Sequence, residues 1–419
     1  MTDAADAPRA PAVVLTSPRD GTPEPVTTPA ALAAAAERLA AGRGPVAVDA
    51  ERASGYRYTH RAYLVQLRRE DAGTVLIDPL PFDDLTPIDE AIAGVEWVLH
   101  AASQDLPCLV ELGLRPTRLF DTELAARLAN LERVGLAALT EELLGFALEK
   151  HHSAADWSTR PLPSAWLSYA ALDVELLIGL RDLLEAELAE QGKLGWAHEE
   201  FAALVAAAGE TTRPRPDPWR RTSGIHKVRG PRALSRVRAL WYARDGVASR
   251  RDSAPGRVLP DSAIVAAAEA DPRDERELLA LPGFGGRSVR RLAPVWIAAL
   301  AEARRLTDAE LPQTPPADGP PPPHRWAERD PVAAARLVRC REVVSRLATL
   351  HALPPENLVS PDAIRRIAWT PPEPSFAGSP ASVEKLDPDT VAEALAATGV
   401  RGWQIGLLAD ELAVALVDP

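Results

Sequence analysis

Five short apolar segments in the first half of the chain have the length and the flanking turns of β-strands, and they alternate with helical stretches. They lie at residues 45–49, 62–67, 74–78, 96–99 and 118–121. The polar sequence Arg-Arg-Glu-Asp-Ala-Gly separates the second segment from the third and predicts an antiparallel hairpin. Helices are expected near residues 28–39, 85–93 and 104–112, and they dominate residues 122–208. This alternation predicts a mixed α/β sheet with flanking helices.

The 419 residues are too many for one hydrophobic core, and proline-rich stretches indicate where the chain divides. Two helical blocks follow the α/β region. Each has an arginine-studded helix and then a helix start, at Leu259-Pro-Asp261 and at Val359-Ser-Pro-Asp362, which indicates a degenerate repeat. We expect a disordered tail (1–24), an α/β domain (25–208), a linker (209–218), a helical domain (219–306), a proline-rich linker (307–326) and a second, divergent helical domain (327–419).

Composition excludes several classes of protein. Apolar residues make up 46% of the chain and charged residues 25%, which is not the composition of a disordered protein. The N-terminal residues form no apolar signal segment and no run of about 18 apolar residues occurs, so neither a standard secretion signal nor a membrane span is expected. Two cysteines, Cys108 and Cys340, are too few for a disulfide framework. A cytoplasmic location is therefore expected.

The charge of the chain is unevenly distributed. The formal net charge of −12 argues against nucleic acid as a partner. Between Arg213 and Arg257, however, thirteen Lys or Arg residues stand against three Asp, which gives a local charge of +10. Because lysine is rare throughout, the abundance of arginine is weak support for phosphate binding, and its clustering is the better sign.

Three groups of acidic residues follow predicted buried elements. Asp49 and Glu51 end the first strand and, two residues apart, face the same side of it. Asp105 follows the strand at 96–99, where it could also complement the dipole of a helix capped by Ser103. Tyr169 and Asp173 are four residues apart on a helix and are therefore neighbours on one face. Carboxylates brought together repel one another unless a cation lies between them.

In this order and context, the residues resemble the motifs of the DEDD 3′–5′ exonuclease superfamily, and in particular those of ribonuclease D. The sequence Asp156-Trp157-Ser-Thr-Arg160-Pro-Leu162, ahead of Tyr169-Ala-Ala-Leu-Asp173, is the most specific part of the resemblance. Two positions need comment. Ala50 stands where similar proteins usually have Thr, on the strand face away from the carboxylates. Ser168 stands where a second branch of the superfamily has His, so the chain resembles the Tyr branch.

The resemblance implies a ribonuclease H-like sheet and a site for two divalent metal ions, Mg²⁺ or Mn²⁺. Asp49, Glu51, Asp105 and Asp173 would bind the metals, and Tyr169 would orient the attacking water. Arg160 and Lys150 are candidates for substrate phosphate contact, although each could equally form a surface salt bridge. Residues 219–306 resemble an HRDC domain through Leu281-Pro-Gly283-Phe-Gly285 and neighbouring motifs, and residues 327–419 resemble a second, divergent copy.

The expected function is that of a metal-dependent 3′–5′ exoribonuclease that releases nucleoside 5′-monophosphates from RNA with a free 3′ end. Precursors of tRNA or of other stable RNA are the expected substrates. Two alternatives remain open from the sequence. One is a 3′–5′ DNA exonuclease of the same superfamily, and the other is a non-catalytic HRDC protein that binds nucleic acid.

Overall fold

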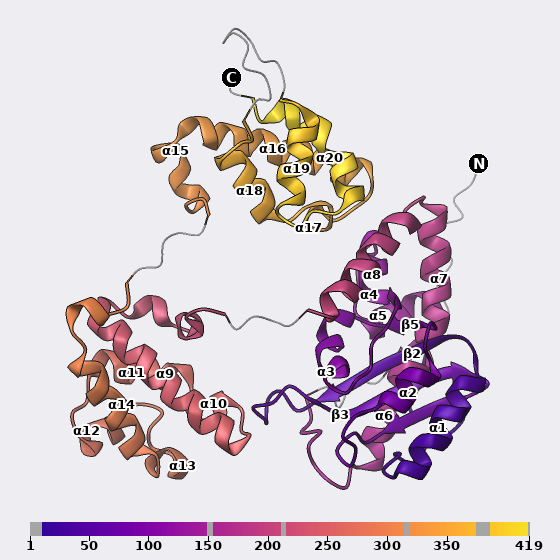
Figure 1. The fold of residues 1–419 in the computed structure, drawn as a ribbon, viewed down its shortest axis with the longest axis horizontal. Helices are drawn as coiled ribbons and strands as arrows, with labels where there is room; N and C mark the ends of the chain where they lie inside the picture. Colours follow the sequence, from indigo (N-terminus) through magenta and orange to yellow (C-terminus); the bar gives the residue numbers. More distant parts are fainter. Residues whose placement is uncertain (1–10, 149–153, 211–214, 314–318, 374–385, 418–419) are drawn as a thin grey trace.

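The structure is a computed structural model that describes residues 11–148, 154–210, 215–313, 319–373 and 386–417. It consists of an α/β domain, a middle helical domain and a C-terminal helical domain (Figure 1). The strands of the α/β domain are β1 (Val13–Leu15), β2 (Arg43–Arg52), β3 (Ala62–Glu70), β4 (Gly73–Ile77), β5 (Glu96–Leu99), β6 (Arg118–Asp121) and β7 (Phe146–Leu148). Its helices are α1 (Pro29–Ala41), α2 (Thr86–Ala91), α3 (Leu106–Glu111), α4 (Thr122–Leu128), α5 (Leu136–Leu139), α6 (Ser164–Glu175), α7 (Leu177–Glu190) and α8 (Leu194–Ala208).

The predicted mixed sheet is confirmed. Five strands are paired in the order β4-β3-β2-β5-β6, with β2, β3 and β4 antiparallel and with β5 and β6 parallel to β2. Each of the five expected strand segments overlaps one of these strands. The predicted capping of the first helix is also present, because the Thr28 side chain accepts a hydrogen bond from Ala31 N.

The strand β2 lies at the centre of the sheet and has two different faces. Val46 and Val48 point into the core beneath α1, whereas the alternate positions face α6. The helix α6 packs across β2, β3 and β4, and α7 packs across β2 and β5. The side of β2 that carries Asp49 and Glu51 is therefore enclosed between the sheet and α6.

The N-terminal segment differs from the expected disordered tail. Within residues 11–24, Val13, Val14 and Leu15 form β1 and pair in parallel with β7. Arg19 N donates to the carboxylate of Glu175, and Thr22 Oγ1 lies 2.6 Å from Ser168 Oγ. Three apolar residues with a partner more than a hundred positions away give no local signal, so the sequence pattern missed this strand. Residues 1–10 lie outside the described part of the chain.

The middle helical domain contains α9 (Pro231–Arg251), α10 (Pro255–Val258), α11 (Asp261–Ala270), α12 (Glu275–Leu279), α13 (Arg287–Arg290) and α14 (Ala293–Arg305). Its core includes Trp219, Phe284 and Trp296, all fully buried. The turn before α13 needs glycine, because Gly283 has φ +87° and a Cβ there would lie 2.7 Å from the Ala263 side chain. This packing accounts for the Leu-Pro-Gly-Phe-Gly sequence.

The C-terminal helical domain contains α15 (Trp326–Arg329), α16 (Pro331–Leu350), α17 (Pro355–Leu358), α18 (Pro361–Trp369), α19 (Pro388–Ala396) and α20 (Gly402–Ala415). Its first helices repeat those of the middle domain at an offset of 100 residues, since α9, α10 and α11 begin at 231, 255 and 261 and α16, α17 and α18 at 331, 355 and 361. Arg236 and Arg336 donate to equivalent carbonyls, those of Ala268 and Ala368. These equivalences support the predicted repeat.

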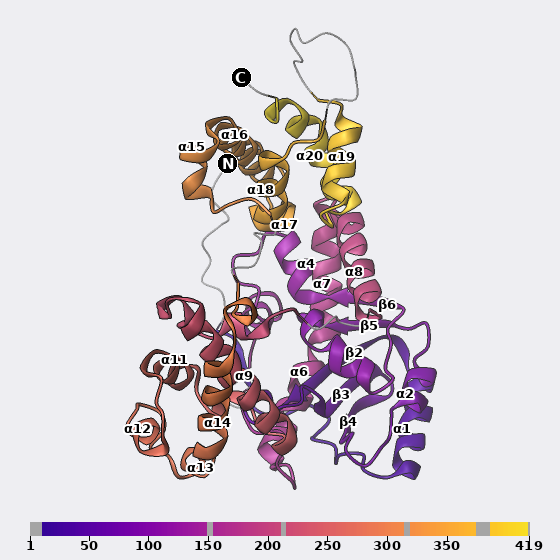
Figure 2. The ribbon, with the colours of Figure 1, turned by 60° about the vertical axis from the view of Figure 1, so that its left-hand side comes forward.

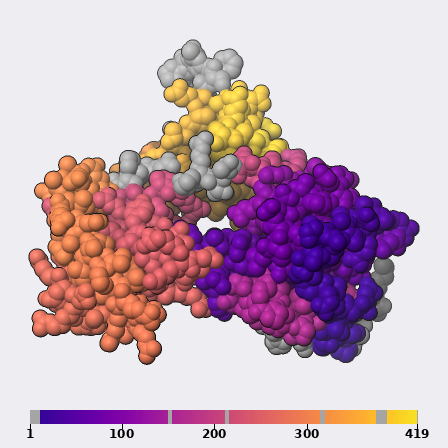
Figure 3. Space-filling model, turned by 60° about the horizontal axis from the view of Figure 1, so that its bottom comes forward, coloured from indigo at the N-terminus to yellow at the C-terminus, as the bar shows by residue number. Residues whose placement is uncertain are grey.

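The C-terminal domain packs on α8 of the α/β domain (Figure 2). The indole rings of Trp196 and Trp403 stack with centroids 4.9 Å apart, and Trp403 Nε1 donates to Glu200. The buried Lys193 ammonium group donates to the carbonyls of Leu128 and Ala352 and so joins the two domains. The space-filling view shows an opening between the α/β domain and the middle helical domain (Figure 3). Within the described residues, no helix is both long and apolar enough to cross a membrane.

Candidate active site

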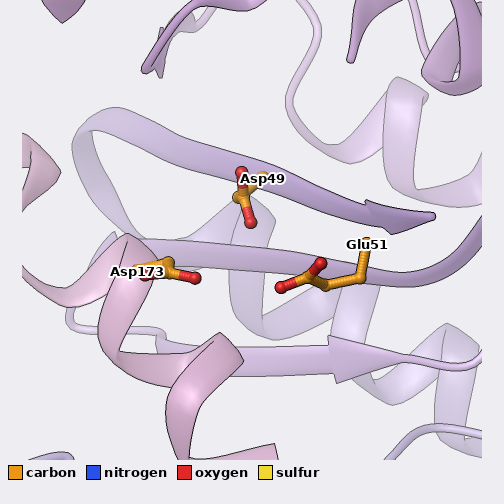
Figure 4. Close-up of side chains that lie close together, drawn as sticks. All are labelled: Asp49, Glu51 and Asp173. Atoms are coloured by element: carbon orange, nitrogen blue, oxygen red, sulfur yellow. The ribbon is translucent and has the colours of Figure 1, made fainter. Parts of the chain in front are cut away.

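Asp49, Glu51 and Asp173 form one acidic group between β2 and α6. Asp49 and Glu51 project from the same face of β2, and Asp173 reaches them from α6 (Figure 4). Each offers a carboxylate oxygen, and these oxygens all lie within 4.8 Å of one another. The i, i+2 spacing on the strand produced the predicted pairing, and the packing of α6 across β2 supplies the third acid.

Asp105 adjoins this group from the end of β5. The chain leaves β5, turns through Ala101 in the left-handed region (φ 57°) and forms a short 3₁₀ turn before α3. Asp105 occupies the N-cap position of α3 but makes no capping hydrogen bond through its side chain, and Ser103 lies in the 3₁₀ turn before the helix, so the predicted cap at Ser103 is not formed. Its carboxyl group forms a hydrogen bond with Asp49, and its Oδ1 lies 3.0 Å from Nη2 of Arg52.

Asp121 positions the segment that carries Asp105, and the sequence reasoning missed it. Its buried carboxylate accepts hydrogen bonds from the backbone amides of Ala101 and Ala102 at 3.1 and 2.9 Å. The same carboxylate caps α4 by accepting from Glu123 N and Leu124 N. Because Asp is a preferred N-cap residue, its place between a strand and a helix start could have predicted the capping role from the sequence. Its second role depends on β5 and β6 being neighbours in the sheet.

Burial raises the pKa values of the four acids in the absence of a cation. Desolvation, together with the charge of Asp49, raises the pKa of Asp105 to about 8, and desolvation raises the pKa of Asp49 to about 6. Burial and then the neighbouring carboxylates raise the pKa of Glu51 and of Asp173 well above the usual range. The group therefore favours binding of positive charge, either as protons or as metal.

The residues fit hard divalent cations. All the candidate ligand atoms are carboxylate oxygens, which Mg²⁺ and Mn²⁺ prefer, and three of them converge within the distance that a metal site requires. A group of carboxylates whose pKa values are raised by burial, and then by mutual repulsion, is stabilised when a dication replaces the protons.

Tyr169 lies one helical turn before Asp173 and forms a hydrogen bond with its carboxylate. Burial, and then the charges of Asp173 and Glu51, raise the pKa of the Tyr169 phenol. The hydroxyl is therefore protonated at neutral pH and acts as a donor. A protonated phenol can orient a water molecule through hydrogen bonds. It is unsuited to removing a proton from that water in the ground state.

The two predicted phosphate-binding residues have different outcomes. Arg160 directs its guanidinium inward: Nε and Nη2 bind the carboxylate of Asp78, Nη2 also donates to Tyr63 O, and Nη1 donates to Trp157 O and Thr159 O. Because its donor groups are already occupied, this placement indicates a structural role and does not support a phosphate contact. Lys150 lies outside the described residues.

Among the described residues of the basic segment between residues 213 and 257, six arginines have protein partners. Arg244 is buried and bonds Asp261 and the carbonyl of Leu259. Arg220 and Arg232 pair with Asp217 and Asp308. Others, Arg236, Arg238 and Arg257, donate to backbone carbonyls. Carboxylate partners thus neutralise part of the positive charge of this segment within the protein, whereas the arginines that donate only to carbonyls keep their charge.

Three family models match successive parts of the chain. A model described as 3′-5′ exonuclease matches residues 23–189, one described as HRDC domain matches residues 233–300, and one described as 3′ to 5′ exonuclease C-terminal domain matches residues 319–416. The fold, the acidic site and these matches define a 3′–5′ exonuclease that carries an HRDC domain.

Curated proteins named ribonuclease D match most of the chain. The protein from Acidiphilium cryptum is 35% identical over 359 residues, covering 80% of this chain and 89% of the relative. The protein from Granulibacter bethesdensis is 31% identical over 371 residues, covering 87% and 91%. The chain belongs to the ribonuclease D family, and its activity is that of a 3′–5′ exoribonuclease.

Two solved structures extend the similarity over the full architecture. A protein from Bifidobacterium adolescentis is 38% identical, with a TM-score of 0.86, and the match covers 97% of this chain and 99% of the other. RNase D from Escherichia coli is 25% identical, with a TM-score of 0.66, and the match covers 94% and 98%. Both matches include the helical domains as well as the nuclease domain.

Proposed function

We propose that the nuclease site binds two divalent ions, Mg²⁺ or Mn²⁺, through Asp49, Glu51, Asp105 and Asp173. The observation that carries this proposal is the convergence of three carboxylates within 4.8 Å, with Asp105 hydrogen-bonded to Asp49. When bound, such ions neutralise the phosphate, activate a water molecule and stabilise the leaving oxygen. Asp105, whose Oδ1 lies 3.0 Å from Nη2 of Arg52, would complete the ligand set.

The remaining residues of the site define the reaction geometry. Tyr169 donates its one hydroxyl hydrogen to Asp173, so its oxygen can accept a hydrogen bond from a water molecule beside it and orient that water. The enclosure of Asp49 and Glu51 between β2 and α6 limits water around the reacting phosphate, which strengthens electrostatic stabilisation there. Hydrolysis at the last phosphodiester then releases a nucleoside 5′-monophosphate and leaves a new 3′ hydroxyl.

The physiological substrate that we propose is the 3′ end of precursors of tRNA or of other stable RNA. Support comes from the family and from the E. coli protein, which is described as an exoribonuclease involved in structured RNA processing. We also infer a cytoplasmic location, in keeping with the free thiols of Cys108 and Cys340.

An assay with equimolar RNA and DNA oligomers, each with a free or a blocked 3′ end, tests the substrate class. The expected result is stepwise shortening of RNA with a free 3′ end, release of 5′-mononucleotides and no shortening of the blocked RNA. Digestion of DNA with inert RNA would favour the alternative of a DNA exonuclease. Absence of turnover with either Mg²⁺ or Mn²⁺ would favour a non-catalytic binding protein.

A further inference from the structure

The loop between β2 and β3, residues 53–61, runs from the active site to the HRDC domain. It begins directly after Arg52 and ends before Ala62, the first residue of β3. At the HRDC domain it meets the corner between α9 and α10. There one carboxylate oxygen of Asp252 accepts three hydrogen bonds, from Tyr58 N at 3.2 Å, Thr59 N at 3.1 Å and Thr59 Oγ1 at 3.1 Å.

Three further contacts bind the first half of the loop to the same corner. Ala254 N donates to Tyr56 O at 2.9 Å, and Arg257 Nε donates to Gly55 O at 2.8 Å. The Arg257 guanidinium carbon lies 4.0 Å from the centroid of the Tyr56 ring. Because most of these bonds reach backbone atoms of the loop, they fix its conformation and do not merely anchor side chains.

The other side of the loop belongs to the nuclease site. Tyr56 packs in the apolar cluster that contains Trp157, Ala170 and, at its edge, Tyr169. The Tyr56 hydroxyl donates to Ala154 O, and Arg57 Nε donates to Ser158 Oγ at 2.7 Å. One short loop therefore connects Glu51 and Arg52 at the acids, the cluster under Tyr169 and the HRDC corner.

The equivalent corner of the C-terminal domain also docks on the nuclease domain. Ala352, at the position equivalent to Asp252, has a similar left-handed conformation, φ 47° against 43°. Its carbonyl accepts a hydrogen bond from the Lys193 ammonium group at 2.8 Å. Both copies of the repeat thus present the same corner to the nuclease domain, which indicates that this corner is a docking element.

We propose that the HRDC domain is a positioning element of the nuclease site: its α9–α10 corner, through Asp252 and Arg257, holds the β2–β3 loop in the conformation that shapes the site beside Glu51 and Tyr169. The role is separate from capture of RNA by the HRDC surface. The proposal rests on the exonuclease activity, but it is independent of which RNA is the physiological substrate.

The proposal predicts a defect even on a short oligoribonucleotide that reaches only the nuclease site. Asp252→Ala in the full-length protein removes the acceptor for Tyr58 N and Thr59 N, and kcat should fall by roughly tenfold or more, because a misplaced site loses rate steeply. Asp252→Asn retains an oxygen acceptor and tolerates the left-handed backbone, so it should remain near the wild-type kcat. The rate of amide hydrogen exchange at residues 54–61 should rise in Asp252→Ala and should not rise in Asp252→Asn.

Matched controls separate positioning from loss of folding. Asp271→Ala removes a carboxylate at another left-handed position of the HRDC domain, where the partners are Arg304 and Arg236, and should leave kcat on the short RNA unchanged. Arg257→Met, at an exposed residue, removes the bond to Gly55 O and the ring contact without disturbing the HRDC core, and should lower kcat in the same direction as Asp252→Ala.

Two results would overturn the proposal. One is an unchanged kcat on the short RNA in both Asp252→Ala and Arg257→Met, with a raised KM only on long RNA, which would make the corner an RNA-binding or tethering element. The other is an equal loss in Asp271→Ala, which would show that the effect is general instability of the HRDC domain. Failure of the wild-type protein to cleave any short RNA would instead contradict the exonuclease assignment itself.

Discussion

Nη2 of Arg52 lies 3.0 Å from Oδ1 of Asp105, so the residue after Glu51 is paired with the acid that follows β5. The charge of Arg52 lowers the pKa values of Asp49, Glu51 and Asp105 against the larger effect of burial. In Arg52→Gln these acids should ionise only at higher pH. The acidic limb of the pH–rate profile at a fixed, subsaturating Mg²⁺ concentration should therefore move to higher pH, because protons and metal compete for the acids. Arg68→Gln, which removes an arginine paired with Asp20, is the control and should not move it.

Tyr169 is expected to contribute to rate and not to metal binding. Tyr169→Phe removes the hydroxyl that bonds Asp173 and leaves the carboxylates in place. We expect a loss of roughly 10²–10⁴-fold in single-turnover rate, the usual range for a positioned proton-handling group. Binding of RNA in the presence of Ca²⁺ should be nearly unchanged. Cleavage at the wild-type rate would show that the pairing with Asp173 is only a packing contact.

The raised pKa values also make stability depend on pH. With the pKa of Asp105 raised from 3.8 to about 8, the folded protein binds more protons than the unfolded chain between these values, so stability falls as pH rises from about 4 to 8. Mg²⁺ should raise the melting temperature more at pH 8 than at pH 5, because it replaces the lost protons. Asp173→Asn, which removes one of the repelling charges, should show a weaker pH dependence without metal. A metal effect that is equal at both pH values would contradict this explanation.

The stacked pair of Trp196 and Trp403 should hold the C-terminal domain on α8. Trp403 is buried, and Trp403→Ala should reduce stability by about 3–5 kcal/mol, the usual cost of truncating a large core side chain. Limited proteolysis should then release the C-terminal domain more readily. Leu350→Ala, at an exposed position of the same domain, is the control. Equal protease resistance in both variants would indicate that the domain docks through other contacts.

Local patterns in the sequence were sufficient for the parts of the site that depend on periodicity. The alternation around Val46 and Val48 predicts β2, and the spacings of Asp49 with Glu51 and of Tyr169 with Asp173 place each pair on one face. These are contacts within one element. The sheet order and the packing of α6 on β2 then bring the pairs together.

The remaining features depend on partners distant in the sequence. The pairing of Arg52 with Asp105, the bonds from Asp121 to the Ala101 turn and the contact of Asp252 with the β2–β3 loop have no periodic signal. For Arg160, the motif identified an informative residue but not its structural role. That role depends on Asp78, which lies 82 positions away in the sequence. The sequence therefore identifies the important residues more readily than it identifies their spatial partners.

We propose that metal ions held by these carboxylates perform the 3′–5′ cleavage of RNA. The most direct test of this proposal is single-turnover cleavage of a 5′-labelled RNA with a free 3′ end across a Mg²⁺ titration, for the wild-type protein and for Asp173→Asn. We predict stepwise shortening by the wild-type protein, with a rate that saturates in Mg²⁺. In Asp173→Asn we predict a rate lower by about three orders of magnitude or more, with RNA binding retained. Cleavage by Asp173→Asn at the wild-type rate would contradict this mechanism. Cleavage by either protein after complete removal of divalent ions would contradict it as well.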